Sequence, residues 1–173
     1  MSELLKNIIR FILLILLQVF VLNRIMLHGF ATPYLYMIFI LLLPFNIPRW
    51  ALMVCGLILG LCLDMFMNTP GMHAAACVVM SYCRPFVINV LSPQGGFETT
   101  RKTPSVASMG WSRFMVYALI LIFIHHVVYF TLEIFDFHDI LFWALKIILS
   151  LIASFVLVFL FEMLLATKTK RYL

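Results

Sequence analysis

Asp64 is the residue with the clearest chemical meaning in this chain, because it lies in an apolar run that reaches from Trp50 to Phe66. A carboxylate at the middle of a bilayer costs about 2.5–3.5 kcal/mol on insertion scales, so it needs hydrogen-bond donors or a task. Gly56 and Gly60 precede it at steps of four, a spacing that lets two helices approach closely. We therefore expect Asp64 to mark a contact between helices or a binding site.

The best donors for Asp64 lie at the start of the next apolar run, because a helix N-terminus offers free N–H groups and a dipole that favours an anion. We also expect His73, the first polar side chain of that run, to be a partner of Asp64, and Gly71 lies in the turn before it. We favour a structural tie between two helices over a ligand site or a proton relay. Arg84 lies too deep to be the partner, at about 18 Å from the turn against about 6 Å for Asp64. We expect it to extend toward the headgroups.

Polar side chains also form stripes on two of the expected helices. In the run after Asp64 they recur at steps of four, four and three: His73, Cys77, Ser81 and Arg84. Such a stripe should face protein rather than lipid. In a later run, His126 and Glu133 share a stripe, and Glu133 can form a neutralised buried ion pair with Lys146. His125 and His126 point about 100° apart, which is weak evidence for a metal site, so no metal or other cofactor is expected.

The composition places these residues inside a membrane. The chain has 173 residues, of which 65% are hydrophobic and only 11% are charged. A soluble core of this size needs far less apolar surface. Because one crossing takes about 20 mostly apolar residues, the chain holds about six crossings and little else. We expect one all-α integral membrane domain over residues 1–173, a bundle with spans at 8–27, 33–45, 49–67, 72–91, 113–135 and 140–166.

Two parts of the chain are less regular than the other spans. The run at 33–45 is framed by Pro33, Pro44 and Pro48, which predicts a tilted or broken span. Residues 92–112 are rich in Gly, Ser, Thr and Pro, so we expect a cytoplasmic loop without fixed secondary structure. The first span could be taken for a cleaved signal, but no small-x-small pattern follows it, so we expect an anchor.

The basic residues predict the orientation, because Lys and Arg collect on the cytoplasmic side of short loops. With six crossings most of them fall on one face: Lys6, Arg10, Arg49, Arg101, Lys102, Arg113, Lys168, Lys170 and Arg171. Both termini are then cytoplasmic, and we expect the basic loop to touch anionic lipid more than a protein. A nucleic-acid partner would need a basic surface in water, which the chain lacks, so none is expected. The four cysteines show no CxxC spacing, which argues against a zinc or iron–sulfur site.

The residues around Asp64 match a known pattern. The segment Gly56–Asp64 reads GLILGLCLD, and Gly71 and three consecutive alanines at 74–76 follow it. This resembles the G-x-x-x-G-L-x-x-D, then G-x-x-A signature of the rod shape-determining protein MreD family. The length, the expected spans, the cytoplasmic termini and the basic tail are also similar to that family. The chain departs from it at 68–70, where Asn-Thr-Pro replaces a glycine-containing turn.

The resemblance implies a non-enzymatic subunit of the cell-elongation complex in the bacterial inner membrane, which helps to organise side-wall peptidoglycan synthesis and cell shape. It implies MreC as the direct partner and, through MreC, the filament protein MreB, RodA and a penicillin-binding transpeptidase. Packing or partner binding is then the expected role of eight residues: Gly56, Gly60, Asp64, Gly71, His73, Arg84, His126 and Glu133. A homodimer through the face of Gly56 and Gly60 stays an alternative.

Two other classes of function are alternatives to a scaffold. The family is similar in fold to the S components of energy-coupling-factor transporters, so a vitamin-binding transporter subunit is the main alternative. S components usually carry an Ala-x-x-x-Ala contact on their first helix, whereas residues 8–22 contain no alanine or glycine. An enzyme would need a nucleophile, a base and a stabilising group at one place. No serine or cysteine has a recognisable spacing from Asp64, His73 or His126, so we expect no enzymatic activity.

Overall fold

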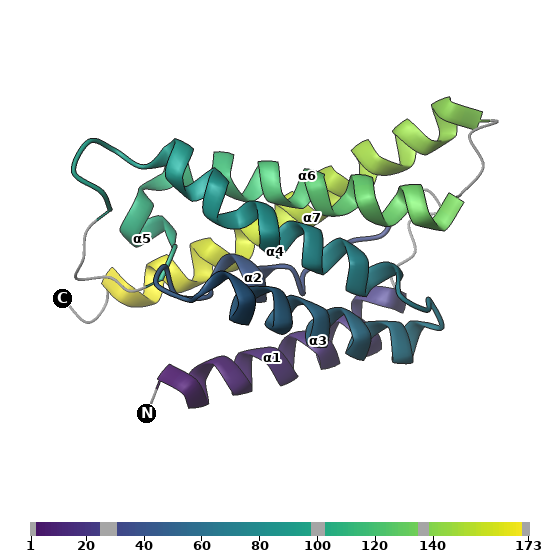
Figure 1. Ribbon diagram of the computed structural model, residues 1–173, viewed down its shortest axis with the longest axis horizontal. Helices are drawn as coiled ribbons and strands as arrows, with labels where there is room; N and C mark the ends of the chain where they lie inside the picture. The colour runs from purple at the N-terminus through teal and green to yellow at the C-terminus, as the bar shows by residue number, and fades with distance from the viewer. Residues whose placement is uncertain (1–2, 25–30, 98–102, 135–138, 171–173) are drawn as a thin grey trace.

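The computed structural model describes residues 3–24, 31–97, 103–134 and 139–170. Within these residues there is no β-strand, and five helices are long and apolar enough to cross a membrane. They are α1 (Glu3–Phe20), α3 (Arg49–Met67), α4 (Met72–Leu91), α6 (Trp111–Ile134) and α7 (Ile140–Lys170). The helices run along one common long axis (Figure 1). The predicted all-α membrane bundle is confirmed.

Helices α3 and α4 form a tight hairpin and have the bounds expected for the third and fourth spans. Pro48, with extended backbone angles, precedes α3. Asn68 ends α3 in the left-handed region at φ 56°, and Gly71 follows at φ 84°. These two positions reverse the chain within residues 68–71, and glycine takes such an angle without steric cost. The hairpin continues into a row in which α4 packs on α6 and α6 on α7.

The segment expected as the second span crosses the bundle without forming a long helix. Residues 31–48, here called the core segment, contain only the four-residue helix α2 (Ile38–Leu41). The core segment runs back through the middle of the bundle, from the end where α1 finishes to the end where α3 begins (Figure 1). Its side chains from Tyr34 to Leu43 are all buried. Irregular backbone at membrane depth is tolerated only where protein surrounds it, so the predicted broken span has a physical basis.

The expected loop at 92–112 contains structure that its composition did not predict. Helix α5 (Val106–Met109) forms there, and Ser105 and Ser108 cap its start reciprocally. Val106 and Met109 are buried, and α5 packs against α6 and α7. The prediction of a loop without secondary structure is therefore wrong for these residues. Arg101 and Lys102, the predicted span ends at 25–27 and 135, and Arg171 lie outside the described residues.

Basic side chains gather at one end of the bundle. Lys6 and Arg10 lie in the first half of α1, Arg49 begins α3, and Arg113 lies in the first turn of α6. These three helices start at the same end, which is also where α7 finishes (Figure 1). We call it the cationic end. The opposite end carries the α3–α4 turn and the acidic residues Glu133 and Asp139.

Candidate functional site

The carboxylate of Asp64 is buried between α3 and α4 and accepts three hydrogen bonds. Its Oδ1 accepts from the backbone N–H of His73 at 3.0 Å and from the Thr69 hydroxyl at 2.9 Å. Its Oδ2 accepts from the backbone N–H of Ala74 at 3.0 Å. The first N–H groups of a helix have no partner inside it, and the dipole favours an anion there. Asp64 therefore caps α4 from the preceding helix, and the predicted tie to these N–H groups is confirmed.

Gly56 and Gly60 let α3 approach α4 at the distance that this cap requires. Both glycines are buried. A Cβ at Gly60 would collide with the backbone of Ala74, and one at Gly56 would collide with Ser81 and the carbonyl of Cys77. The small-xxx-small spacing thus serves a contact within the chain. Because α4 covers this face, a second copy of the chain cannot use it.

Arg84 lies inside the bundle, and the expectation that it extends toward the headgroups is wrong. It is 1% exposed, and its Nε donates to the Tyr117 hydroxyl at 2.9 Å. Its Nη2 donates to the carbonyl of Leu43, and Tyr117 donates to the carbonyl of Leu41 at 2.9 Å. These carbonyls lie at the end of α2, where helical partners are missing. Depth along α4 alone could not reveal that the core segment offers acceptors at this level.

Gln18 of α1 holds the other part of the core segment in a similar way. Its Oε1 accepts from the backbone N–H of Leu35 at 2.9 Å, and its Nε2 donates to the carbonyl of Pro33 at 3.1 Å. Gln18 is fully buried. Gln18 was not predicted as a site residue, although an amide within the otherwise apolar stretch 11–22 indicates buried backbone nearby.

Two serines of α7 complete the support of the core segment. Ser150 accepts from the N–H of Thr32 at 3.0 Å, and Ser154 accepts from the N–H of Tyr34 at 2.9 Å. Both serines are fully buried. They lie four residues apart, so they share one face of α7. This spacing was present in the sequence and was missed.

A cluster of aromatic rings fills the bundle beside the Asp64 cap. The Tyr36 hydroxyl lies 2.7 Å from Nδ1 of His73 and 2.8 Å from Nε2 of His125. Tyr34 and Tyr129 pack around them, with ring centroids 4.5–6.3 Å apart. The imidazole of His73 therefore binds Tyr36, and only its backbone binds Asp64. The expectation that the stripe of His73 faces protein is confirmed.

The Tyr36 hydroxyl can donate only one proton. This fixes which groups donate and which accept in the hydrogen-bonded series His73–Tyr36–His125. With both imidazoles neutral, it donates to one of them and accepts the N–H of the other. The outer nitrogens, Nε2 of His73 and Nδ1 of His125, are buried without a partner among the described residues. One of them is then a donor and the other an acceptor. These two nitrogens can therefore bind a small group that has both a hydrogen-bond acceptor and a hydrogen-bond donor.

His126 and Glu133 lie on the same helix in different surroundings. Nδ1 of His126 donates to the carbonyl of Ile122 at 2.8 Å, which leaves Nε2 to accept from the Ser154 hydroxyl at 3.2 Å. Glu133 pairs with Lys146 at 2.6 Å, as expected, but the pair is partly exposed rather than buried. The Glu133 side chain keeps 33% of its accessible surface, so the prediction of a buried pair is wrong.

The described residues thus give two polar assemblies, the Asp64 cap and the side chains that hold the core segment. Among these residues, no three His, Cys, Asp or Glu side chains are arranged to hold a metal ion. Comparisons of the chain with family models, curated proteins and solved structures find no match. The function has to be argued from the site, because a fold alone does not specify one.

Proposed function

We propose that this chain is a non-enzymatic membrane scaffold of the MreD kind, a subunit of the complex that organises side-wall peptidoglycan synthesis during cell elongation. One observation carries the proposal. Gly56, Gly60 and Asp64, on which the resemblance to MreD rests, act together on α4: the two glycines allow its close approach to α3, and Asp64 caps its start. A motif whose members all close one hairpin suits a rigid scaffold.

The direct partner in this proposal is MreC, and through it MreB, RodA and a penicillin-binding transpeptidase. The lipid-facing surfaces of α1, α3 and α7 are rich in large apolar side chains, such as Leu13, Met65 and Leu141. A transmembrane segment of a partner would associate there by packing, since lipid provides no hydrophobic drive between helices. The cationic end supports a bacterial inner-membrane orientation with both termini in the cytoplasm.

The absence of an enzymatic role is part of the proposal and rests on the best serine–histidine pair among the described residues. Ser154 and His126 are hydrogen-bonded, yet both are fully buried. The Ser154 oxygen also accepts from the backbone of Tyr34, so it supports the core segment. An acyl-transfer site needs a nucleophile that substrate can reach and a group that stabilises developing charge. Hydrolase or transferase activity that disappears in His126→Ala would contradict this reading.

Affinity purification of the tagged chain from native membranes, followed by mass spectrometry, tests the proposed function. We expect MreC to be enriched, together with MreB, RodA and a transpeptidase. Gly60→Leu should weaken the recovery of MreC and round the cells, because it drives α3 and α4 apart. Val54→Leu, a change on the exposed face of α3, is the control and should alter neither. Recovery of ATP-binding transport subunits in place of wall-synthesis proteins would contradict the proposal.

A vitamin-binding transporter subunit is the second candidate, and the core segment favours it. Many transporters bind substrates at discontinuous helices near the middle of the membrane. Nε2 of His73 and Nδ1 of His125 have no partner among the described residues, and they offer one donor and one acceptor beside that segment. Calorimetric titration of the purified protein with B vitamins tests this candidate. Tight binding that is lost in Tyr36→Phe would support it, and no binding of any of them would leave the scaffold as the better account.

A further inference from the structure

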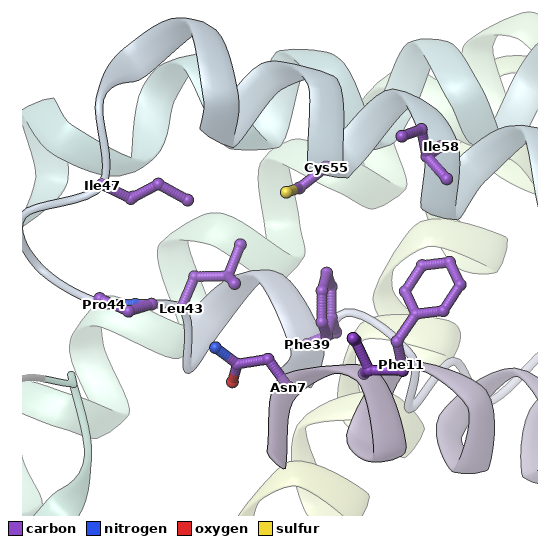
Figure 2. Close-up of a pocket in the computed structure, with 9 residues that line it drawn as sticks. Asn7, Phe11, Phe39, Leu43, Pro44, Ile47, Cys55 and Ile58 are labelled. Atoms are coloured by element: carbon purple, nitrogen blue, oxygen red, sulfur yellow. The ribbon is translucent and has the colours of Figure 1, made fainter. Parts of the chain in front are cut away.

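Two parts of the bundle interior differ in the hydrogen bonds that they can form. The groove of about 350 Å³ between α1 and α3 is lined mostly by apolar side chains such as Phe11, with an amide from Asn7 (Figure 2). The His73–Tyr36–His125 series, in contrast, consists of three fully buried polar side chains that two short hydrogen bonds join. These side chains come from α4, the core segment and α6. A change in hydrogen bonding at one helix can therefore pass through the series to another.

The hydrogen bonds of Tyr36 allow two arrangements of protons. In the first, Tyr36 donates to Nδ1 of His73 and accepts from Nε2 of His125, so both imidazoles carry their proton on Nε2. In the second, Tyr36 accepts from Nδ1 of His73 and donates to Nε2 of His125, so both imidazoles carry their proton on Nδ1. Unlike tautomers would require Tyr36 to donate twice, or would leave its own proton without an acceptor in the series. The two histidines therefore share one tautomer in either arrangement.

The passage from the first arrangement to the second moves one proton at each step along the series. Nδ1 of His125 takes up a proton from water, and Nε2 of His125 passes its proton to the Tyr36 oxygen. Tyr36 passes its own proton to Nδ1 of His73, and Nε2 of His73 releases a proton to water. One proton enters and one leaves, so all three side chains stay neutral. The outer nitrogens on α4 and α6 exchange the roles of donor and acceptor.

We propose that the His73–Tyr36–His125 series is a two-state relay that couples hydrogen bonding at the start of α4 to hydrogen bonding inside α6. The coupling needs no movement of the backbone, because only protons change place. This regulatory device goes beyond the proposed scaffold function and does not depend on it. It gives the α3–α4 hairpin a direct connection to a helix on the other side of the core segment.

The Asp64 cap lies at the α4 end of this relay, because Oδ1 of Asp64 accepts the backbone N–H of His73 at 3.0 Å. The first arrangement shifts the protons of the series toward α4, and the second shifts them toward α6. A negative charge at the α4 end stabilises the arrangement in which the protons lie closer to it. Both histidines should therefore be Nε2–H tautomers in the wild type, which makes Nδ1 of His125 an acceptor.

The ¹⁵N chemical shifts of the imidazole rings, measured by NMR on the full chain in lipid nanodiscs, distinguish the two tautomers. His73 and His125 should have equal populations of the Nε2–H form at every temperature. His126 is the internal control, because its Nδ1 donates to the carbonyl of Ile122 and should stay Nδ1–H throughout. This measurement uses the wild-type protein and does not depend on how a variant folds. Unequal populations at His73 and His125 would overturn the relay.

Asp64→Asn tests the coupling, because it removes the charge and retains an accepting oxygen. The ratio of Nε2–H to Nδ1–H should fall about fivefold at both His73 and His125, the order expected for one charge near the end of the series. In Tyr36→Phe, which lacks the hydroxyl that joins the two rings, Asp64→Asn should change His73 alone. A change at only one histidine with Tyr36 present, or no change at either, would overturn the proposal.

Discussion

The α3–α4 hairpin and the core segment both bury polar groups at membrane depth, but different groups need partners in the two regions. In the hairpin, the side chain of Asp64 takes its donors from the backbone of α4. In the core segment, backbone groups take their partners from side chains of α1, α4, α6 and α7. The hairpin bonds join residues 5–10 positions apart, whereas those of the core segment join residues 15–120 positions apart. The hairpin is thus a local unit, and the core segment depends on the assembled bundle.

The largest effect is expected where the hairpin closes. Gly60→Leu should destabilise the protein by about 3 kcal/mol or more, because overpacking against backbone cannot be relieved by a change of rotamer. Unfolding of the purified protein in mixed micelles measures this loss. Val54→Leu, exposed on the same helix, should stay within about 0.5 kcal/mol of the wild type. Equal stability of the two variants would show that the close approach of the helices is not required.

The removal of the Asp64 cap should cause the second-largest loss of stability. Asp64→Ala leaves the N–H groups of His73 and Ala74 without their acceptor, at a cost of about 2–3 kcal/mol. Amide hydrogen exchange should rise at these two positions and stay unchanged in the core segment if the hairpin is a local unit. Asp64→Asn should fall between wild type and Asp64→Ala, because its amide retains one accepting oxygen. Equal loss of protection in both regions would break the distinction between them.

Arg84→Met tests the core segment as Asp64→Ala tests the hairpin. It should lower the free energy of unfolding by about 2 kcal/mol. The carbonyl of Leu43 loses its donor, and the Tyr117 hydroxyl loses its contact with the guanidinium. Amide exchange should rise around α2, while the amides of His73 and Ala74 keep their protection. An Arg84 side chain that reached the headgroups would make this variant nearly neutral, and that result would contradict the structure.

Ser154→Ala should have a smaller effect than the three changes above, about 1 kcal/mol. The change removes the acceptor for the N–H of Tyr34 and the donor to His126. Ser150→Ala should cost less, because its hydroxyl supports one partly buried bond. Thermal unfolding of the two variants side by side measures the order. A larger loss in Ser150→Ala would show that the His126 contact does not stabilise the segment.

The same contrast explains what could be predicted from the sequence. The bounds of α3 and α4 and the donors of Asp64 follow from local spacing, since each contact lies within one turn and its flanking helices. The side-chain partners of the core segment could not be predicted, because Gln18 and Ser154 approach it only through the fold of the whole bundle. Arg84 was misplaced for the same reason. Helix α5 was missed because a Ser- and Pro-rich composition is typical of loops.

Amide hydrogen exchange at Leu35, compared between the wild type and Gln18→Leu in lipid nanodiscs, tests the central claim most directly. Leu35 lies outside any regular helix, and its N–H donates to the buried oxygen of Gln18 at 2.9 Å. Slow exchange in the wild type, faster exchange in Gln18→Leu and unchanged exchange at His73 and Ala74 are the predicted results. Rapid exchange at Leu35 in the wild type, or no change in the variant, would contradict a core segment that side chains hold at membrane depth.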